Sequence, residues 1–176
     1  MRIIAGTLRG RNFESPHSHK THPMSEKMRG ALFNVLGDIS DLAVFDAYGG
    51  SGAIAFEAIS RGAKKALITE IDPIVAKTIT ANIKSLGVAN TVQLVRVNAA
   101  IYSQNYPYEH FNIVVCDPPY DDIHPTQIIQ LGKSVAKDGL LVISKPTGSA
   151  DFDFDDLELI SKKNYGDGTL VFYRKI

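Results

Sequence analysis

The feature of this sequence that most restricts its fold is a regular alternation of short apolar runs with segments of helical periodicity. The apolar runs predict strands at residues 42–46, 66–70, 91–97, 111–116 and 139–144. Helices are predicted at residues 25–37, 52–61, 73–86 and 125–137, and the stretch between 97 and 111 is predicted to be irregular. This alternation is typical of a mainly parallel sheet with helices on both faces. We therefore predict an α/β fold with a doubly wound sheet.

Both ends of the chain add extended segments to this pattern. Residues 157–163 and 169–175 flank two glycines and predict a hairpin, which adds an antiparallel edge to what becomes a seven-stranded sheet. Residues 1–4 and 11–14 predict two short extended segments around a tight turn. We expect a single domain over residues 1–176, with a basic N-terminal extension at 1–24 and a catalytic body at 25–176.

Length and composition limit the class of protein. The chain has 176 residues, of which 44% are hydrophobic and 22% charged, as expected for one soluble domain. No apolar stretch approaches the length of a membrane span, and the amino terminus lacks the pattern of a secretory signal, so we expect a cytoplasmic protein without a membrane partner. Cysteine and histidine residues with metal-ligand spacing are absent, and we expect no metal site.

A glycine-rich turn joins the strand at 42–46 to the following helix. The run is Asp46, Ala47, Tyr48, Gly49, Gly50, Ser51 and Gly52. Glycines without a Cβ let the backbone approach a ligand closely. Glu70 lies 20 residues after Gly50, at the end of the next strand, where an acidic side chain typically binds ribose hydroxyls. The sequence therefore predicts a nucleoside-containing cofactor at this turn.

Two cofactors suit this spacing. Gly50, Gly52 and Ala55 form a loose dinucleotide fingerprint, so the glycines alone leave a nicotinamide cofactor open. Asp46 at the end of the strand favours S-adenosylmethionine, because the amino group of that cofactor needs an acceptor there. Tyr48 and Gly49 stand where the loop would surround its methionine part.

The run Asp117, Pro118, Pro119 and Tyr120 directly follows the apolar strand at 111–116. An exocyclic amine on a nucleobase is a poor nucleophile, because its lone pair is delocalised into the ring. Asp117 and the Pro118 carbonyl could hold such an amine, and the prolines fix the backbone between them. Tyr120 could stack on a base that has left its helix. An ordinary turn is the alternative, but the combination with the glycine turn and Glu70 favours methyl transfer.

The candidate residues share one edge of the predicted sheet. Asp46, Glu70, Asn98 and Asp117 come at or just after the ends of predicted strands. In open α/β sheets, ligands bind at the carboxyl ends of the strands, near the switch in strand order. We therefore expect these side chains to surround one site.

Charge is distributed unevenly along the chain. The formal net charge is zero, but residues 1–30 carry six basic and two acidic side chains, a net charge of +4. A basic arm of this kind could contact a phosphate backbone. Scattered surface charges remain an equally good interpretation of the charge pattern alone.

Several stretches of the chain resemble the RsmD family, bacterial methyltransferases that modify the exocyclic N2 of a guanine in 16S ribosomal RNA. The most specific is the start of the chain, residues 1–6 with 8–11 and 22–36. Residues 46–52 with 57–63 resemble the cofactor loop and its helix, and 117–120 the catalytic motif. Three departures are His22 for a usual arginine, Met24 with Ser25 for two threonines, and Gly49 for an alanine.

The resemblance implies a Rossmann-like S-adenosylmethionine-dependent methyltransferase. Its catalytic residues would be Asp117, Pro118, Pro119 and Tyr120. Its cofactor-binding residues would be Asp46, Ala47, Tyr48, Gly49, Gly50, Ser51, Gly52, Glu70, Ile71, Asn98 and Ala99, with Glu70 at the ribose and Asn98 and Ala99 at the adenine. Its RNA-binding residues would be Arg9, Arg11, His22, Lys27 and Arg29. The expected partner is 16S rRNA, alone or in a partly assembled small ribosomal subunit, and the expected state is a monomer.

Two other functions remain open on the motifs. A DNA adenine-N6 methyltransferase uses the same catalytic motif but normally carries a separate target-recognition domain. A nucleotide-cofactor-binding protein without nucleic-acid activity would use residues 117–120 only as a structural turn.

Overall fold

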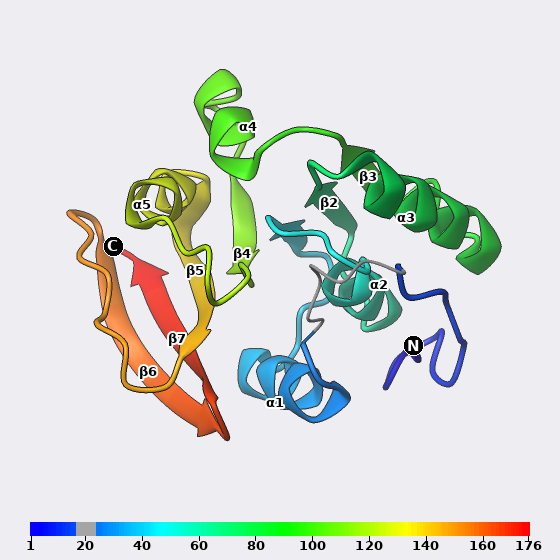
Figure 1. Cartoon of the computed structure of the whole chain (residues 1–176), viewed down its shortest axis with the longest axis horizontal. Coiled ribbons are helices and arrows are strands. Elements are labelled where there is room, and N and C mark those ends of the chain that lie inside the picture. Colours follow the sequence, from blue (N-terminus) through cyan, green and yellow to red (C-terminus); the bar gives the residue numbers. More distant parts are fainter. Residues whose placement is uncertain (17–23) are drawn as a thin grey trace.

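The computed structural model describes residues 1–16 and 24–176 and contains a seven-stranded sheet (Figure 1). The strands are β1 (Ala43–Asp46), β2 (Lys65–Thr69), β3 (Val92–Val95), β4 (Phe111–Cys116), β5 (Val135–Pro146), β6 (Leu157–Tyr165) and β7 (Gly168–Lys175). Their order is β3-β2-β1-β4-β5-β7-β6. The first five strands are parallel, whereas β7 is antiparallel to both β5 and β6. The predicted doubly wound, mainly parallel sheet is confirmed.

Five helices cover the two faces of the sheet in the described part of the chain. They are α1 (Glu26–Leu36), α2 (Ala53–Ser60), α3 (Pro73–Leu86), α4 (Ala99–Asn105) and α5 (Pro125–Gly132). Neighbouring residues of a strand face opposite layers. Val44 packs in a cluster with residues of α1 and α2, whereas Phe45 packs with residues of α4 and α5. On the same face as Val44, Ile68 of β2 packs with residues of α2 and α3.

The order of the strands reverses between β1 and β4. Strands β2 and β3 extend from one side of β1, and β5 follows on the other side of β4. A crevice forms at such a reversal, because the connections leave the two strands toward opposite faces. Asp46 ends β1, and Asp117 directly follows the end of β4. The fold therefore places the two aspartates on either side of this reversal.

The amino-terminal segment is part of the packed body. Phe13 makes an edge contact with Phe56 of α2, with ring centroids 5.3 Å apart. The Glu14 amide donates to Asn82 Oδ1 at 3.0 Å, and Asn82 Nδ2 donates back to the Glu14 carbonyl at 2.8 Å. These contacts attach the segment to α2 and α3, beside which it runs in Figure 1.

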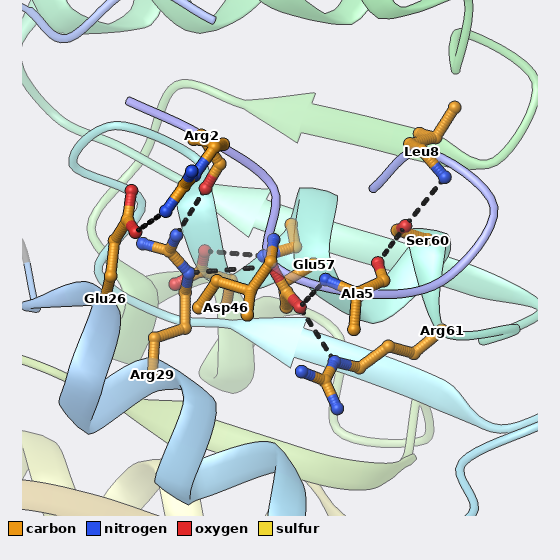
Figure 2. A network of polar contacts seen from close by, with 11 residues as sticks. Arg2, Ala5, Leu8, Glu26, Arg29, Asp46, Glu57, Ser60 and Arg61 are labelled. Carbon is orange, nitrogen blue, oxygen red and sulfur yellow. Dashed lines mark hydrogen bonds and ion pairs between the residues drawn. The ribbon is translucent and has the colours of Figure 1, made fainter. Parts of the chain in front are cut away.

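A buried polar network holds the start of the chain (Figure 2). Glu57 of α2 accepts from the amides of Ile4 and Ala5 at 2.8 and 3.0 Å, and from Nε of Arg61 at 2.8 Å. Nε of Arg29 in α1 lies 3.7 Å from Glu57 Oε2, and both side chains are fully buried. One carboxylate thus joins α1, α2 and the amino-terminal segment.

Two predictions about secondary structure are wrong. Residues 99–105, predicted to be irregular, form α4, whose first amides donate to the Asn98 side chain at 2.9 and 3.2 Å. The predicted helix at 125–137 ends at Gly132, and β5 begins at Val135 instead of at Gly139. Val135 is buried and pairs with Phe111, and the register then shifts around Asp138, whose φ is +62°. The boundaries of the other predicted helices and strands agree within two residues, whereas the extended segments predicted at 1–4 and 11–14 are joined only by the single bridge between Arg2 and Asn12.

Candidate functional site at the strand reversal

A cavity of about 500 Å³ opens at the carboxyl ends of the parallel strands. Nine of the eleven predicted cofactor-binding residues line it: Ala47, Tyr48, Gly49, Gly50, Ser51, Glu70, Ile71, Asn98 and Ala99. Asp117 and Pro119 of the predicted catalytic motif line the same cavity. Asp46, Gly52, Pro118 and Tyr120 are outside its lining. The fold therefore brings the glycine turn and the predicted catalytic motif, 65 residues apart at their nearest ends, to one cavity.

The glycine turn is packed tightly against β2. The Gly49 amide donates to the Thr69 carbonyl at 2.9 Å, and the Thr69 hydroxyl donates to the Ala47 carbonyl at 2.8 Å. A Cβ on Gly49 would lie 2.5 Å from Ile68 Cγ2 and 3.0 Å from the Thr69 carbonyl oxygen. The packing of this chain therefore accounts for glycine at a position where the resembled family usually has alanine.

Glu70 connects the turn to the loop after β2. Its Oε2 accepts from the Gly50 amide at 2.9 Å, and its Oε1 accepts from the Asp72 amide at 2.9 Å. Each carboxylate oxygen can accept more than one hydrogen bond, so both oxygens keep capacity for a ligand hydroxyl. Glu70 thus shapes the cavity wall and presents an acceptor within it.

Asp46 lies beneath the glycine turn. Its Oδ2 accepts from the Ala55 amide at 3.3 Å, while its buried Oδ1 has no partner among the described residues. Burial raises the pKa of Asp46 well above its usual range; the Ala55 hydrogen bond opposes this effect, and the charges of Asp117 and Glu70 add to it. The unpaired Oδ1 leaves one acceptor behind the turn without a protein donor.

Asn98 and its neighbours form the part of the wall contributed by α4 and α5. The Asn98 side chain caps α4, and its Nδ2 donates to Gln127 Oε1 of α5 at 3.2 Å. Ile71, which follows the neighbouring strand β2, also lines the cavity and is 67% exposed. An exposed apolar side chain beside an amide is a suitable setting for a planar heterocycle.

Asp117 has a perturbed carboxyl group. It is partly buried at the end of β4, and burial raises its pKa to about 6, with a hydrogen bond from the Ser144 hydroxyl acting in the opposite direction. At neutral pH the group is therefore mainly ionised, yet close to its pKa. A carboxylate in this state both accepts hydrogen bonds and can receive a proton.

Tyr120 lies next to the cavity. The residue is 37% exposed, and its hydroxyl lies 2.9 Å from Ser144 Oγ. Pro118 is buried behind the motif, and the Pro119 carbonyl accepts from the Asp122 amide at 2.9 Å, which closes a turn. The backbone of the motif is thus fixed between β4 and this turn.

Of the four predicted RNA-binding residues that the structure describes, three are exposed and one is buried. Arg9 and Lys27 are exposed, whereas Arg11 donates to the carbonyls of Ser85 and Leu86 at the end of α3. The prediction that Arg29 contacts RNA is wrong, because its side chain is fully buried against Glu57 and donates to the Arg2 carbonyl at 2.6 Å. His22 lies outside the described residues.

Ten further residues of the cavity were not predicted from the sequence. Met24, Ala53, Ile54, Thr69, Asp72, Val75, Val97, Asp122, His124 and Gln127 also line it. His124 Nε2 and Asp122 Oδ1 lie 2.9 Å apart, just after the predicted catalytic motif. Their position two and four residues beyond Tyr120 is a signal that could have included them. No set of three metal-ligating side chains that could hold a metal occurs within residues 1–16 and 24–176.

Comparison with known proteins identifies the family. Residues 1–174 match the family model described as Conserved hypothetical protein 95. The chain belongs to this family. A relative is Ribosomal RNA small subunit methyltransferase D of Escherichia coli K12, which is 36% identical over 121 residues, or 68% of this chain and 60% of that protein. The match thus spans less than two thirds of that relative. The predicted resemblance to the RsmD family is confirmed.

Solved structures share the fold of this chain over most of its length. An Escherichia coli protein described as a candidate methyltransferase, YhhF, has a TM-score of 0.84 and 28% identity, covering 99% of this chain and 97% of that one. An RNA methyltransferase of Salinibacter ruber in complex with S-adenosylhomocysteine has a TM-score of 0.66 and 18% identity, covering 88% and 94%. The predicted fold class is therefore confirmed. No helix in the described part of the chain is long and apolar enough to cross a membrane.

Proposed function

We propose that this chain transfers a methyl group from S-adenosylmethionine to ribosomal RNA, and specifically to the exocyclic N2 of a guanine in 16S rRNA. The observation that carries the proposal is that Asp117 lines the same cavity as Glu70 and the glycine turn. The printed name of the Escherichia coli relative supports the RNA substrate. We place this activity in the cytoplasm and assign it to a monomer, acting on naked rRNA or on a partly assembled small subunit.

The residues of the cavity fit the proposed cofactor. The volume of about 500 Å³ is within the usual range for ligand sites. Glu70 would hold the ribose hydroxyls, and Asn98, Ala99 and Ile71 would surround the adenine. The turn from Ala47 to Ser51 would surround the methionine part, and the unpaired Oδ1 of Asp46 matches its amino group, directly or through water. When bound, the cofactor supplies a methyl group on an activated sulfonium.

The residues of the catalytic motif would align and deprotonate the target amine. The Asp117 carboxylate and the Pro118 carbonyl accept hydrogen bonds from its N–H groups, which orients the nitrogen lone pair. Because its pKa is about 6, the Asp117 carboxylate could also take the amine proton that the nitrogen must lose in exchange for the methyl group. Tyr120 stacks on the extruded base and excludes water from the reacting atoms.

The substrate can be tested with tritiated S-adenosylmethionine. We expect label to enter 16S rRNA, naked or in small-subunit particles, and to be recovered as N2-methylguanosine after nuclease digestion. Duplex DNA containing adenine targets serves as the comparison substrate. Label in DNA alone would favour the adenine-N6 function, and cofactor binding without label in any nucleic acid would contradict methyl transfer to RNA.

Glu70 should control cofactor affinity. We expect Glu70→Ala to weaken S-adenosylhomocysteine binding by about 100-fold, because it removes a charged acceptor and releases the amides of Gly50 and Asp72. Isothermal titration measures this change directly. Glu158→Ala, on the exposed part of β6, is the control and should bind as the wild type does. If Glu70→Ala bound S-adenosylhomocysteine as tightly as the wild type does, the proposed ribose contact would be contradicted.

A further inference from the structure

The environment of the Tyr120 hydroxyl is formed by the antiparallel part of the sheet. Tyr120 follows β4, but its hydroxyl contacts Ser144 Oγ of β5 at 2.9 Å. Ser144 is 1% exposed, so its hydroxyl is screened from solvent and its contacts are made within the protein. Tyr120 as a whole residue is 37% exposed, so it is accessible from solvent while its hydroxyl is held by Ser144.

Gly168 provides the space that the phenol occupies. This buried glycine begins β7 and pairs with Pro146 of β5. A Cβ at this position would lie 2.4 Å from the Tyr120 hydroxyl oxygen and 3.3 Å from Met28 Cε. The φ of Gly168 is not positive, so its backbone conformation is open to other residues. Space for Tyr120 is therefore the reason for glycine here.

Ser144 also interacts with the catalytic carboxylate. The Ser144 hydroxyl lowers the pKa of Asp117 against the larger effect of burial. One serine thus lies between the two side chains that the proposed reaction needs at opposite parts of the base. Neither Ser144 nor Gly168 lines the cavity of the glycine turn.

We propose that Ser144 and Gly168 form a socket that positions the Tyr120 ring to receive the target base. The socket is defined by these two residues, and the proposal rests on the function proposed above. A tyrosine ring that is fixed before binding loses less conformational freedom when a base stacks on it. The hydroxyl contact to Ser144 sets the direction of the ring, and Gly168 lets its end approach β7. Both are positioning residues, because they act through Tyr120.

The hydrogen bond can be tested by a double-mutant cycle that needs neither cofactor nor RNA. Tyr120→Phe and Ser144→Ala each remove one partner of the same contact. We expect each to lower the urea midpoint of unfolding and the double variant to lower it no further than the larger single change. Ser134→Ala is the matched control. Ser134 is also a buried serine, but it precedes the start of β5, far along the strand from Ser144, and its hydroxyl donates to Ser103 Oγ at 2.8 Å. Additive effects of Tyr120→Phe and Ser144→Ala would overturn the contact.

Activity assays then test positioning. At about pH 8, where Asp117 is ionised, we expect Tyr120→Phe and Ser144→Ala each to lower kcat/KM for RNA by about tenfold, because a misplaced group costs this order of rate. S-adenosylhomocysteine affinity should change by less than about twofold, since the socket lies outside the cofactor cavity. Ser134→Ala should keep wild-type kcat/KM. Equal losses in Ser134→Ala and Ser144→Ala would show a merely structural role and contradict the proposal.

Gly168 offers a rescue experiment. We expect Gly168→Ala to lower kcat/KM for RNA by roughly 10- to 100-fold, because the added methyl displaces the Tyr120 hydroxyl. In a Tyr120→Phe background the same change should cost nothing further, because the atom 2.4 Å away is absent. Full activity of Gly168→Ala, or an equal loss in both backgrounds, would overturn the socket. If the wild type does not methylate RNA, the proposed function fails, and the unfolding cycle still decides the hydrogen bond.

Discussion

Replacing Asp117 by asparagine is expected to lower methyl transfer to RNA by about 1,000-fold, within the range attributed to general acid–base groups. Asparagine keeps the size of the side chain and one acceptor oxygen, but it has no charge and cannot take the amine proton. Cofactor binding should stay near the wild-type level, because Glu70 and the glycine turn are unchanged. Single-turnover rates measured with tritiated S-adenosylmethionine, together with titration of S-adenosylhomocysteine, separate the two effects.

Asp121→Asn is the matched control for this variant. Asp121 is exposed one residue beyond Tyr120 and does not line the cavity. It should retain the wild-type rate. A wild-type rate in Asp117→Asn would show that the charge of the carboxylate has no role, and a loss of the same size in Asp121→Asn would trace the effect to the loop instead.

The pH dependence of the reaction should report the same carboxyl group. Because the pKa of Asp117 is raised to about 6, the carboxylate is present above this pH and is protonated below it. The rate should therefore be highest at neutral and alkaline pH and fall as the pH drops through about 6. Ser144→Ala removes a hydrogen bond that lowers this pKa, so its acid limb should move to higher pH. A rate independent of pH between 5 and 8 would contradict a requirement for the carboxylate.

The raised pKa of Asp117 affects stability in the opposite direction to the rate. A carboxyl whose pKa is higher in the folded state than its usual 3.8 favours folding when it is protonated, and this contribution is lost as the pH rises through about 6. The cost of ionised Asp117 at neutral pH is at most about 3 kcal/mol. We therefore expect Asp117→Asn to increase the free energy of unfolding relative to the wild type, and to do so more at pH 7.5 than at pH 4. Urea denaturation at the two pH values measures this difference.

Local pattern was sufficient to predict the sheet and about half of the residues that line the cavity. Apolar runs of four to six residues gave the parallel strands because strands buried on both faces need no alternation. Asp46 and Asp117 end two such runs, and any doubly wound sheet brings its carboxyl ends to one edge. Hence the sequence predicted that the glycine turn and the catalytic motif would meet, although they are far apart along the chain.

Partners distant in the sequence account for the errors. The irregular start of β5 depends on pairing with Phe111 in another strand, which local periodicity does not contain. Helix α4 has only seven residues, which are too few for a clear apolar stripe. Its N-cap residue Asn98 is the one local signal for a helix start in this stretch. The RNA-binding prediction for Arg29 rests on its charge and on the resemblance, yet Arg29 lies three and four residues before the buried Leu32 and Phe33. That spacing places Arg29 on the buried face of α1.

Removing Glu57 should produce the largest loss of stability among the changes considered. We expect Glu57→Ala to lower the free energy of unfolding by about 3–5 kcal/mol, because it leaves the buried Arg29 guanidinium without its counter-charge. It also removes the acceptor for the Ile4 and Ala5 amides. For a domain of this size, the loss corresponds to a melting temperature lower by about 10 °C. Urea denaturation and calorimetry provide the two measurements.

The exposed pair of Arg2 and Glu26 offers the matched comparison. These side chains are 61% and 44% exposed and lie 2.9 Å apart, beside the same network (Figure 2). Glu26→Ala should leave the free energy of unfolding close to that of the wild type, because solvent already screens both charges. Hydrogen exchange at Ile4 and Ala5 should accelerate in Glu57→Ala and stay slow in Glu26→Ala. Equal costs for the two substitutions would mean that burial of Glu57 does not decide its contribution, and that another contact holds the amino-terminal segment on α2.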